Sequence, residues 1–274
     1  MIFKIISLVA VAALAGCGGS NDGSATNPTT EGNDGLTTLK TYSDGSGFVG
    51  FRQTVNGTQY SGTILGGDVA TTSYDSFGAA NLDSVVSIQS TAKGEYYSAI
   101  ATIDNVQREV YVYEADNGEA YYMVGDSCIG PCIAAYGVAP TDIPSGTWIY
   151  SGDFIALGEG GNLSDSATGT FTMSANFTSE TADFSASSPN GKLVFSSNNA
   201  TINTSTGTFN GTGSAVSPGS AGGSGNEWDI DIYGSFHGTG ATSVSGVTSS
   251  NLQTVTGPDN VVGHVNGAFA GSLN

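Results

Sequence analysis

Short runs of alternating apolar and polar residues, each ended by turn residues, fill this chain from about residue 41 onward. An apolar residue at every second position is typical of a strand that buries one face, because successive side chains of a strand point to opposite sides of the sheet. Between residues 41 and 140, the pairs Asn56-Gly57 and Asn117-Gly118 predict two tight hairpins. The pattern therefore predicts a small antiparallel sheet domain. Its strands are expected at Gly47–Gln53, Thr58–Leu65, Glu95–Ile103, Arg108–Ala115 and Glu119–Val124.

Eight further runs of this kind follow a proline-containing boundary at Tyr136–Ser145. Eight up-and-down antiparallel strands can close into a barrel just wide enough to be filled by side chains, and closure removes the sheet edges. We therefore predict an all-β chain, almost without helix, in which such a barrel occupies residues 141–274. Its strands are expected at Thr147–Leu157, Thr168–Thr178, Thr181–Ala186, Lys192–Asn203, Gly207–Gly213, Glu227–Phe236, Thr242–Val247 and Val261–Leu273.

The N-terminus has the features of a secretory signal peptide. Lys4 precedes an apolar run, Ile5–Ala13, that is too short to span a bilayer, which takes about 20 apolar residues. The tetrapeptide Leu14-Ala15-Gly16-Cys17 is similar to a bacterial lipobox. That resemblance implies that residues 1–16 are removed and that Cys17 is acylated, and several acyl chains give lasting attachment to membrane lipid. The alternative is an ordinary signal peptide followed by an incidental cysteine.

Residues 17–40 are rich in Gly, Ser, Asn, Asp and Thr and contain little that can be buried. We expect a flexible tether, spanning on the order of 25 Å as a random coil, that lifts the folded part away from the membrane. Gly18 follows the cysteine, and by resemblance to proteobacterial sorting this favours the outer membrane. We expect display at the cell surface, with a periplasmic orientation as the alternative.

The charge balance is strongly acidic, with 24 acidic residues against 6 basic ones and a net charge of −18. Such a surface repels phosphate backbones, so we expect no nucleic-acid partner. A very acidic chain can be disordered, but 12 Tyr, 12 Phe and 2 Trp indicate a packed core.

Cys128 and Cys132 are the cysteines that remain beside Cys17. Thiols of exported proteins are oxidised, so a small structural disulfide loop is the natural interpretation. A redox pair and half of a metal site are the alternatives, although redox pairs usually have two intervening residues and no cluster of His or Cys lies nearby in the sequence.

Four stretches in the second half, taken in order, resemble the β-barrel domain of the transferrin-binding protein B family, which includes the factor H binding proteins and haem-carrying surface lipoproteins. They are Ile143–Gly152, Gly169–Phe177, Gly234–Ala241 and Val262–Gly271. The resemblance implies a handle-like sheet domain before the barrel. It also implies a surface lipoprotein that captures an iron-carrying protein, haem or another exported partner.

This chain departs from the family pattern at Val244-Ser245-Gly246-Val247, where the family has a pair of glycines. It also has one barrel and one N-terminal domain instead of the duplicated lobes of the large transferrin receptors. Binding surfaces of the family lie largely in the N-terminal domain and loops, which match nothing here. The ligand-binding residues are therefore unknown from the sequence.

No enzyme signature stands out, and we expect a protein without catalytic activity. The chain has no Gly-x-Ser-x-Gly elbow, and a nucleophile also needs a base. The two histidines, His237 and His264, both fall inside the barrel motifs. His237 is a candidate axial ligand for haem, and the alternative is a residue of a barrel rim or turn. We expect no resident cofactor apart from this haem candidate.

Two groups of carboxylates suit calcium by residue type, because calcium prefers oxygen ligands. Asp229 and Asp231 share one face of a strand. The second group surrounds a hairpin turn and consists of Glu114, Asp116 and Glu119. Neither matches a known loop spacing, so solvated acidic residues are the favoured interpretation, and we expect no metal site.

Adjacent tyrosines occur twice, at Tyr96-Tyr97 and Tyr121-Tyr122. Tyrosine is common at binding sites because it combines a large contact area with a hydrogen bond. In a strand the two members of a pair face opposite sides, so ordinary packing of a two-sided sheet explains them at least as well.

Taken together, the sequence predicts an outer-membrane lipoprotein that binds an extracellular ligand without catalysis, in iron, haem or protein capture. A structural or adhesive envelope lipoprotein without a small ligand is the alternative, followed by an enzyme with a site assembled from loops. The oligomeric state is open.

Overall fold

The computed structural model describes the strands of the chain and the connections that pack against them. These are residues 36–41, 48–55, 58–65, 81–103, 106–125, 132–157, 167–188, 193–217, 226–250, 253–254, 262–263 and 265–274. The predicted signal peptide, Cys17, Cys128 and His264 lie outside this set. Within the set, no helix has the length and apolar character needed to cross a membrane.

The first half forms an eight-stranded antiparallel sheet with the order β1-β2-β3-β8-β7-β6-β5-β4. Two consecutive meanders, β1 to β3 and β4 to β8, meet where β3 pairs with β8. The strands are β1 Leu36–Thr41, β2 Phe48–Val55, β3 Thr58–Leu65, β4 Asn81–Ser90, β5 Gly94–Ile103, β6 Val106–Ala115, β7 Ala120–Gly125 and β8 Cys132–Val138.

The five strands expected in this half are present as β2, β3, β5, β6 and β7, while β1, β4 and β8 were missed. β1 begins at Leu36, inside the segment expected to be tether. Strand β8 runs to Val138 and so includes the start of the predicted boundary at Tyr136–Ser145. The sheet is therefore larger than the small sheet predicted from the sequence.

The second half is a closed antiparallel barrel with the order β10-β11-β12-β13-β14-β15-β18-β9. Its strands are β9 Thr147–Leu157, β10 Ala167–Asn176, β11 Thr181–Ser187, β12 Val194–Asn203, β13 Thr208–Ser217, β14 Asn226–His237, β15 Ser243–Ser250 and β18 Asn266–Leu273. A two-residue pair, β16 Gln253–Thr254 with β17 Val262–Gly263, precedes the last strand. The prediction of eight up-and-down strands is confirmed, except that the run expected from Val261 is divided into β17 and β18.

Aromatic rings fill the interior of the barrel. Phe269 is central, with its ring centroid 4.6 Å from that of Phe184 and 4.9 Å from that of Phe171. Glycines on neighbouring strands make room for these rings: a Cβ added at Gly246 would lie 2.4 Å from Cζ of Phe269. The barrel core thus matches the side-chain-filled interior that the sequence predicted. The large, fully buried rings are Tyr150, Phe154, Phe171, Phe195, Phe236 and Phe269.

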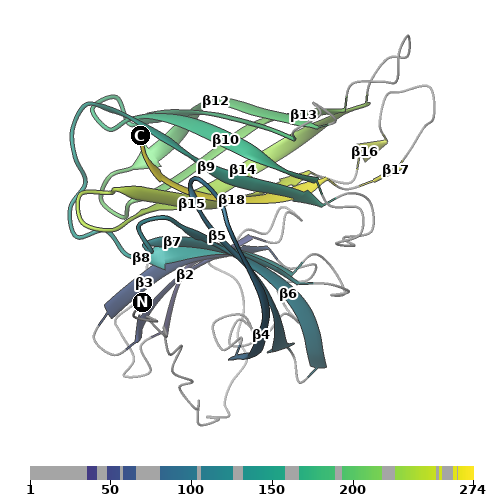
Figure 1. The fold of residues 1–274 in the computed structure, drawn as a ribbon. Helices are drawn as coiled ribbons and strands as arrows, with labels where there is room; N and C mark the ends of the chain where they lie inside the picture. Colours follow the sequence, from purple (N-terminus) through teal and green to yellow (C-terminus); the bar gives the residue numbers. More distant parts are fainter. Residues whose placement is uncertain are drawn as a thin grey trace, which may run out of the picture.

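The sheet lies across one side of the barrel and packs on the outer faces of β9, β15 and β18 (Figure 1). Small residues of β18, Ala268 and Ala270, let the sheet approach closely, and both are fully buried. A second apolar core fills the junction. Its members are Tyr113, Ala115, Ala120, Tyr122, Val124, Ile133 and Ala135 from the sheet, and Ile155, Leu157, Val247, Ala268 and Ala270 from the barrel. The two domains therefore pack through a continuous apolar interface.

Candidate functional site

Polar contacts tie the β6–β7 hairpin turn of the sheet to the β14–β15 turn of the barrel. Asn117 Nδ2 donates a hydrogen bond to Ser243 Oγ at 2.6 Å, and Thr242 Oγ1 donates to Glu119 Oε2. Gly238 has φ +78°, and a Cβ there would lie 2.0 Å from Glu119 Oε2. Glu119 therefore serves the contact between the domains, because its carboxylate fills the space above this glycine.

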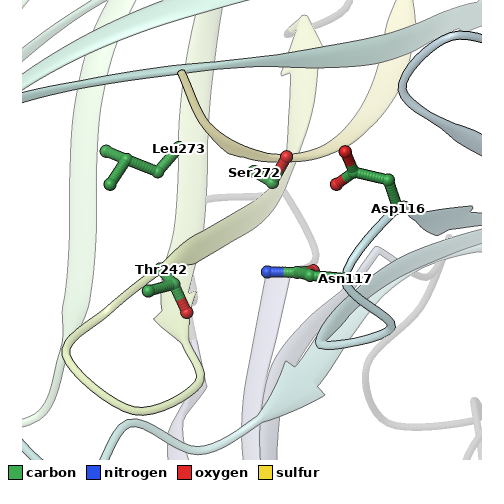
Figure 2. A pocket seen from close by; sticks show the side chains of 5 residues that line it. All are labelled: Asp116, Asn117, Thr242, Ser272 and Leu273. Atoms are coloured by element: carbon green, nitrogen blue, oxygen red, sulfur yellow. The ribbon is translucent and has the colours of Figure 1, made fainter.

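A shallow, open depression of about 310 Å³ lies beside these contacts (Figure 2). The β6–β7 turn contributes Asp116 and Asn117, and the barrel contributes Thr242, Ser272 and Leu273. Figure 2 shows the Asn117 and Thr242 side chains extending into the space between the two turns. The lining offers one carboxylate, one amide and two hydroxyls, which can hydrogen-bond a polar group but include no nucleophile paired with a base.

His237 is the last residue of β14, lies at this junction and is fully buried. Its Nε2 lies 2.8 Å from Ser245 Oγ on β15, and its ring packs so closely on β8 that a Cβ at Gly137 would lie 2.6 Å from Cγ. Burial lowers the pKa of the imidazole to about 3, so the ring is neutral at ordinary pH. Haem iron could reach this histidine only if the sheet separated from the barrel.

A half-buried carboxyl group, Asp153 on β9, faces the sheet. Tyr122 donates a hydrogen bond from its hydroxyl to Asp153 Oδ1 at 2.6 Å. Tyr96, Tyr113 and Tyr122 stand side by side on β5, β6 and β7, with ring centroids 5.1 Å and 5.3 Å apart. Burial raises the pKa of Asp153 to about 6, although hydrogen bonds from Tyr122 and Tyr96 lower it. Nothing in the sequence pattern pointed to this group, since its enclosure depends on which face of β9 the sheet covers.

The opposite face of the sheet carries a second set of polar and aromatic side chains, one from each of four adjacent strands. We call Glu95, Glu114, Tyr121 and Tyr136, on β5, β6, β7 and β8, the outer row, because each lies directly opposite the next across the strands. Strand alternation points them away from the barrel, since their neighbours Tyr96, Tyr113, Tyr122 and Ala135 pack toward it. Glu95 is exposed and the other three are half-buried.

Tyr97 completes this face. Its hydroxyl lies 2.8 Å from Glu95 Oε2 and 3.0 Å from Glu114 Oε2. Burial and the two carboxylates raise the pKa of Tyr97, so its hydroxyl remains protonated. The adjacent tyrosines thus point to opposite faces, as strand geometry requires: Tyr96 and Tyr122 toward the barrel, Tyr97 and Tyr121 away from it.

The carboxylates considered for calcium do not converge. Glu114 accepts hydrogen bonds on the outer face of the sheet, whereas Glu119 faces the barrel and Asp116 lines the depression. No group of three or more His, Cys, Asp or Glu within the described ranges is placed to hold a metal ion. Asp229 is exposed on β14 and Asp231, on the same face, is half-buried.

Cys132 is the first residue of β8 and pairs across the strands with Gly125 of β7. Cys128 falls in the connection between these strands, outside the described residues. The disulfide between Cys128 and Cys132, like lipidation of Cys17, therefore remains a prediction.

No family model matches this chain, and no curated protein matches it. Among solved structures, the fold is similar to that of transferrin binding protein B. A mutant of that protein from Haemophilus parasuis Hp5 aligns over 87% of this chain and 65% of its own, at 10% identity and a TM-score of 0.43. The isotype 1 protein from serogroup B Neisseria meningitidis aligns over 87% of this chain and 52% of its own, at 10% identity and a TM-score of 0.45.

A structure of intact Ap-TbpB, with N and C lobes, aligns over 91% of this chain and 44% of its own, at 13% identity and a TM-score of 0.37. The chain thus spans less than two thirds of the length of each of these structures.

Proposed function

We propose that this protein is a lipid-anchored lipoprotein of the outer membrane that captures an exported partner on its surface and catalyses no reaction. The sequence supports the anchor, through the lipobox at Cys17 and the tether up to residue 40. The resemblance of the four barrel motifs makes an iron-carrying protein, haem or another exported protein the first candidates for the partner.

The outer row is the observation that carries this proposal. The barrel interior is packed with aromatic rings, so a ligand has to bind on the outside of the molecule. One side of the barrel is covered by the sheet. The other face of the sheet presents half-exposed tyrosines and carboxylates in a fixed register, and such amphipathic side chains are typical of interaction surfaces.

Within the proposal a protein partner is favoured over haem. His237 is enclosed between β14, β15 and β8, so it is poorly placed to ligate an iron from outside. The same enclosure makes it a poor general base. The outer row extends over four strands, which suits a second polypeptide better than a buried planar cofactor.

Three experiments test the proposal. On intact cells, added protease should remove the folded part of the lipoprotein; digestion only after outer-membrane rupture would contradict capture at the surface. Soluble protein comprising residues 18–274, immobilised and exposed to serum or growth medium with haem included, should retain a specific partner. Retention of nothing under any of these conditions would instead favour a structural or adhesive envelope protein. Turnover in a broad hydrolase screen, abolished by one point change, would favour an enzyme.

A further inference from the structure

The outer row has an unusual charge arrangement. Glu95 and Glu114 are direct cross-strand partners, and like charges at such positions destabilise a sheet. Lys93 is the one basic residue whose side chain the structure describes, and its Nζ donates to Asn274 Oδ1 instead. Among the described residues, therefore, no cation compensates the two carboxylates.

Hydrogen-bond donors are also scarce in the row. Tyr97 has one hydroxyl proton for two carboxylates that both lie within 3.0 Å of its oxygen. The hydroxyl of Tyr121 lies 2.7 Å from the carbonyl oxygen of Gly118 and 3.4 Å from Glu114 Oε1, so its proton is directed mainly to the carbonyl. Ser90 Oγ adds one contact to Glu95, at 3.2 Å. Each carboxylate has about four acceptor sites, and most remain open to an external donor.

An aromatic platform adjoins these carboxylates. The rings of Tyr121 and Tyr136 are stacked with centroids 5.3 Å apart and an interplanar angle of 15°. A guanidinium or ammonium group over such a ring is attracted by the ring quadrupole. At the other end of the face, Ile88 is 58% exposed and pairs with Tyr97 across β4 and β5. It can cover the aliphatic stem of a long basic side chain.

We propose that the outer row is a docking surface for a basic, extended polypeptide segment, with arginine or lysine side chains placed between Glu95 and Glu114 and over the Tyr121–Tyr136 pair. Arginine suits it best, because its planar group binds a carboxylate through two hydrogen bonds and stacks on aromatic rings. At the usual strand spacing the row is about 15 Å long, which is the reach of roughly five extended residues. The net charge of −18 steers a basic partner toward the protein.

This inference deepens the proposed function by assigning the chemistry of the partner, and it rests on that function for its biological meaning. The probe is a ten-residue peptide of alternating arginine and threonine, capped at both ends and labelled, titrated into protein of residues 18–274. We expect saturable binding that weakens as salt is added. A peptide with glutamate in place of arginine should not bind.

A strongly acidic protein attracts any cationic peptide, so a matched control is needed. The double variant E95Q/E114Q removes two charges from the row, and E109Q/E227Q removes two exposed charges elsewhere, on the barrel-facing side of β6 and on β14. We expect at least tenfold weaker binding for the first and less than twofold for the second. An equal loss of peptide affinity in the two double variants would show that only the net charge of the protein matters, and would overturn the proposal.

A second pair of variants tests the aromatic platform without relying on charge. Y136F keeps the ring and should bind within twofold of the unmodified protein, whereas Y136L should bind at least threefold more weakly. Equal affinity of Y136F and Y136L for the peptide would show that the aromatic rings do not contribute to binding.

Failure of the proposed function is a separate result. A partner retained from serum or medium equally well by wild type and E95Q/E114Q would support capture and refute the outer row as the docking surface. If the protein binds the arginine peptide and not the glutamate peptide but retains no partner from serum or medium, capture is refuted and the preference of the outer row for basic segments stands. Binding of neutral oligosaccharides in preference to the basic peptide would overturn the assignment of the partner.

Discussion

Replacing Asp153 with asparagine removes a carboxyl group that the sheet and the barrel enclose between them. Asparagine has nearly the same shape, and its side-chain oxygen can still accept the hydrogen bond from Tyr122. Burial raises the pKa of Asp153 from 3.8 to about 6 in the folded protein. The folded state therefore holds this proton more tightly than the unfolded chain does. The stabilisation associated with the protonated form is complete below pH 3.8 and is lost as the pH rises through about 6.

A rise of about two pKa units corresponds to about 3 kcal/mol, at 1.36 kcal/mol per unit. About 2 kcal/mol of this falls between pH 4.5 and 7.5. Over that interval the free energy of unfolding of D153N should rise by about 2 kcal/mol relative to that of the wild type. D153N should therefore be the more stable protein at neutral pH.

The assay is urea unfolding of wild type and D153N at several pH values between 4.5 and 7.5, comparing midpoints at unchanged m. Subtracting one protein from the other removes the pH dependence of every group they share. A difference between D153N and the wild type that stays constant with pH would refute the enclosure of a titrating carboxyl group at this interface.

Three further predictions concern the core, the contact between the domains and the cysteine loop. Phe269→Ala should lower the free energy of unfolding by about 3–5 kcal/mol in a denaturant titration, because the ring fills the centre of the barrel; a loss below about 1 kcal/mol would contradict a filled interior. Gly238→Ala should destabilise by more than about 1 kcal/mol, since the added Cβ meets the Glu119 carboxylate at a left-handed φ, and unchanged stability would show that this contact is loose. Thiol titration of the folded, unreduced protein should find neither Cys128 nor Cys132 free, whereas two free thiols would exclude the disulfide.

The barrel was predictable because its strands are regular. In β11, for example, buried and exposed positions alternate from Ala182 through Asp183 and Phe184 to Ser185. Strand β4 lacks that regularity, since its register shifts between Leu82 and Ser84 and again between Val85 and Ser87. A bulge breaks the period of two on which strand recognition depends.

Strand β8 was missed for a different reason. Ile133, Ala134 and Ala135 are consecutive and all buried, so the first part of this strand shows no alternation of apolar and polar residues in the sequence. The same effect hid its pairing with β3, which joins the two meanders into one sheet.

The candidate site depends on register, which the sequence alone does not give. Glu114 was noticed for its place near a hairpin turn, yet its neighbours in the structure are Glu95 and Tyr121 on adjacent strands. Tyr136 appeared to be part of a boundary and became the end of the outer row only once β8 was placed beside β7. Asp153 could not have been singled out, because its burial requires a sheet formed some 30 residues earlier in the chain.

Hydroxyl-radical footprinting of the protein, free and bound to the partner retained in the capture experiment, shows which surface the partner covers. If the partner docks on the outer row, oxidation of Tyr97, Tyr121 and Tyr136 falls on binding, while Ile149, which is 48% exposed on the barrel, is oxidised as before. Protection of Ile149 with the three tyrosines unchanged would place the binding surface on the barrel and exclude the outer row.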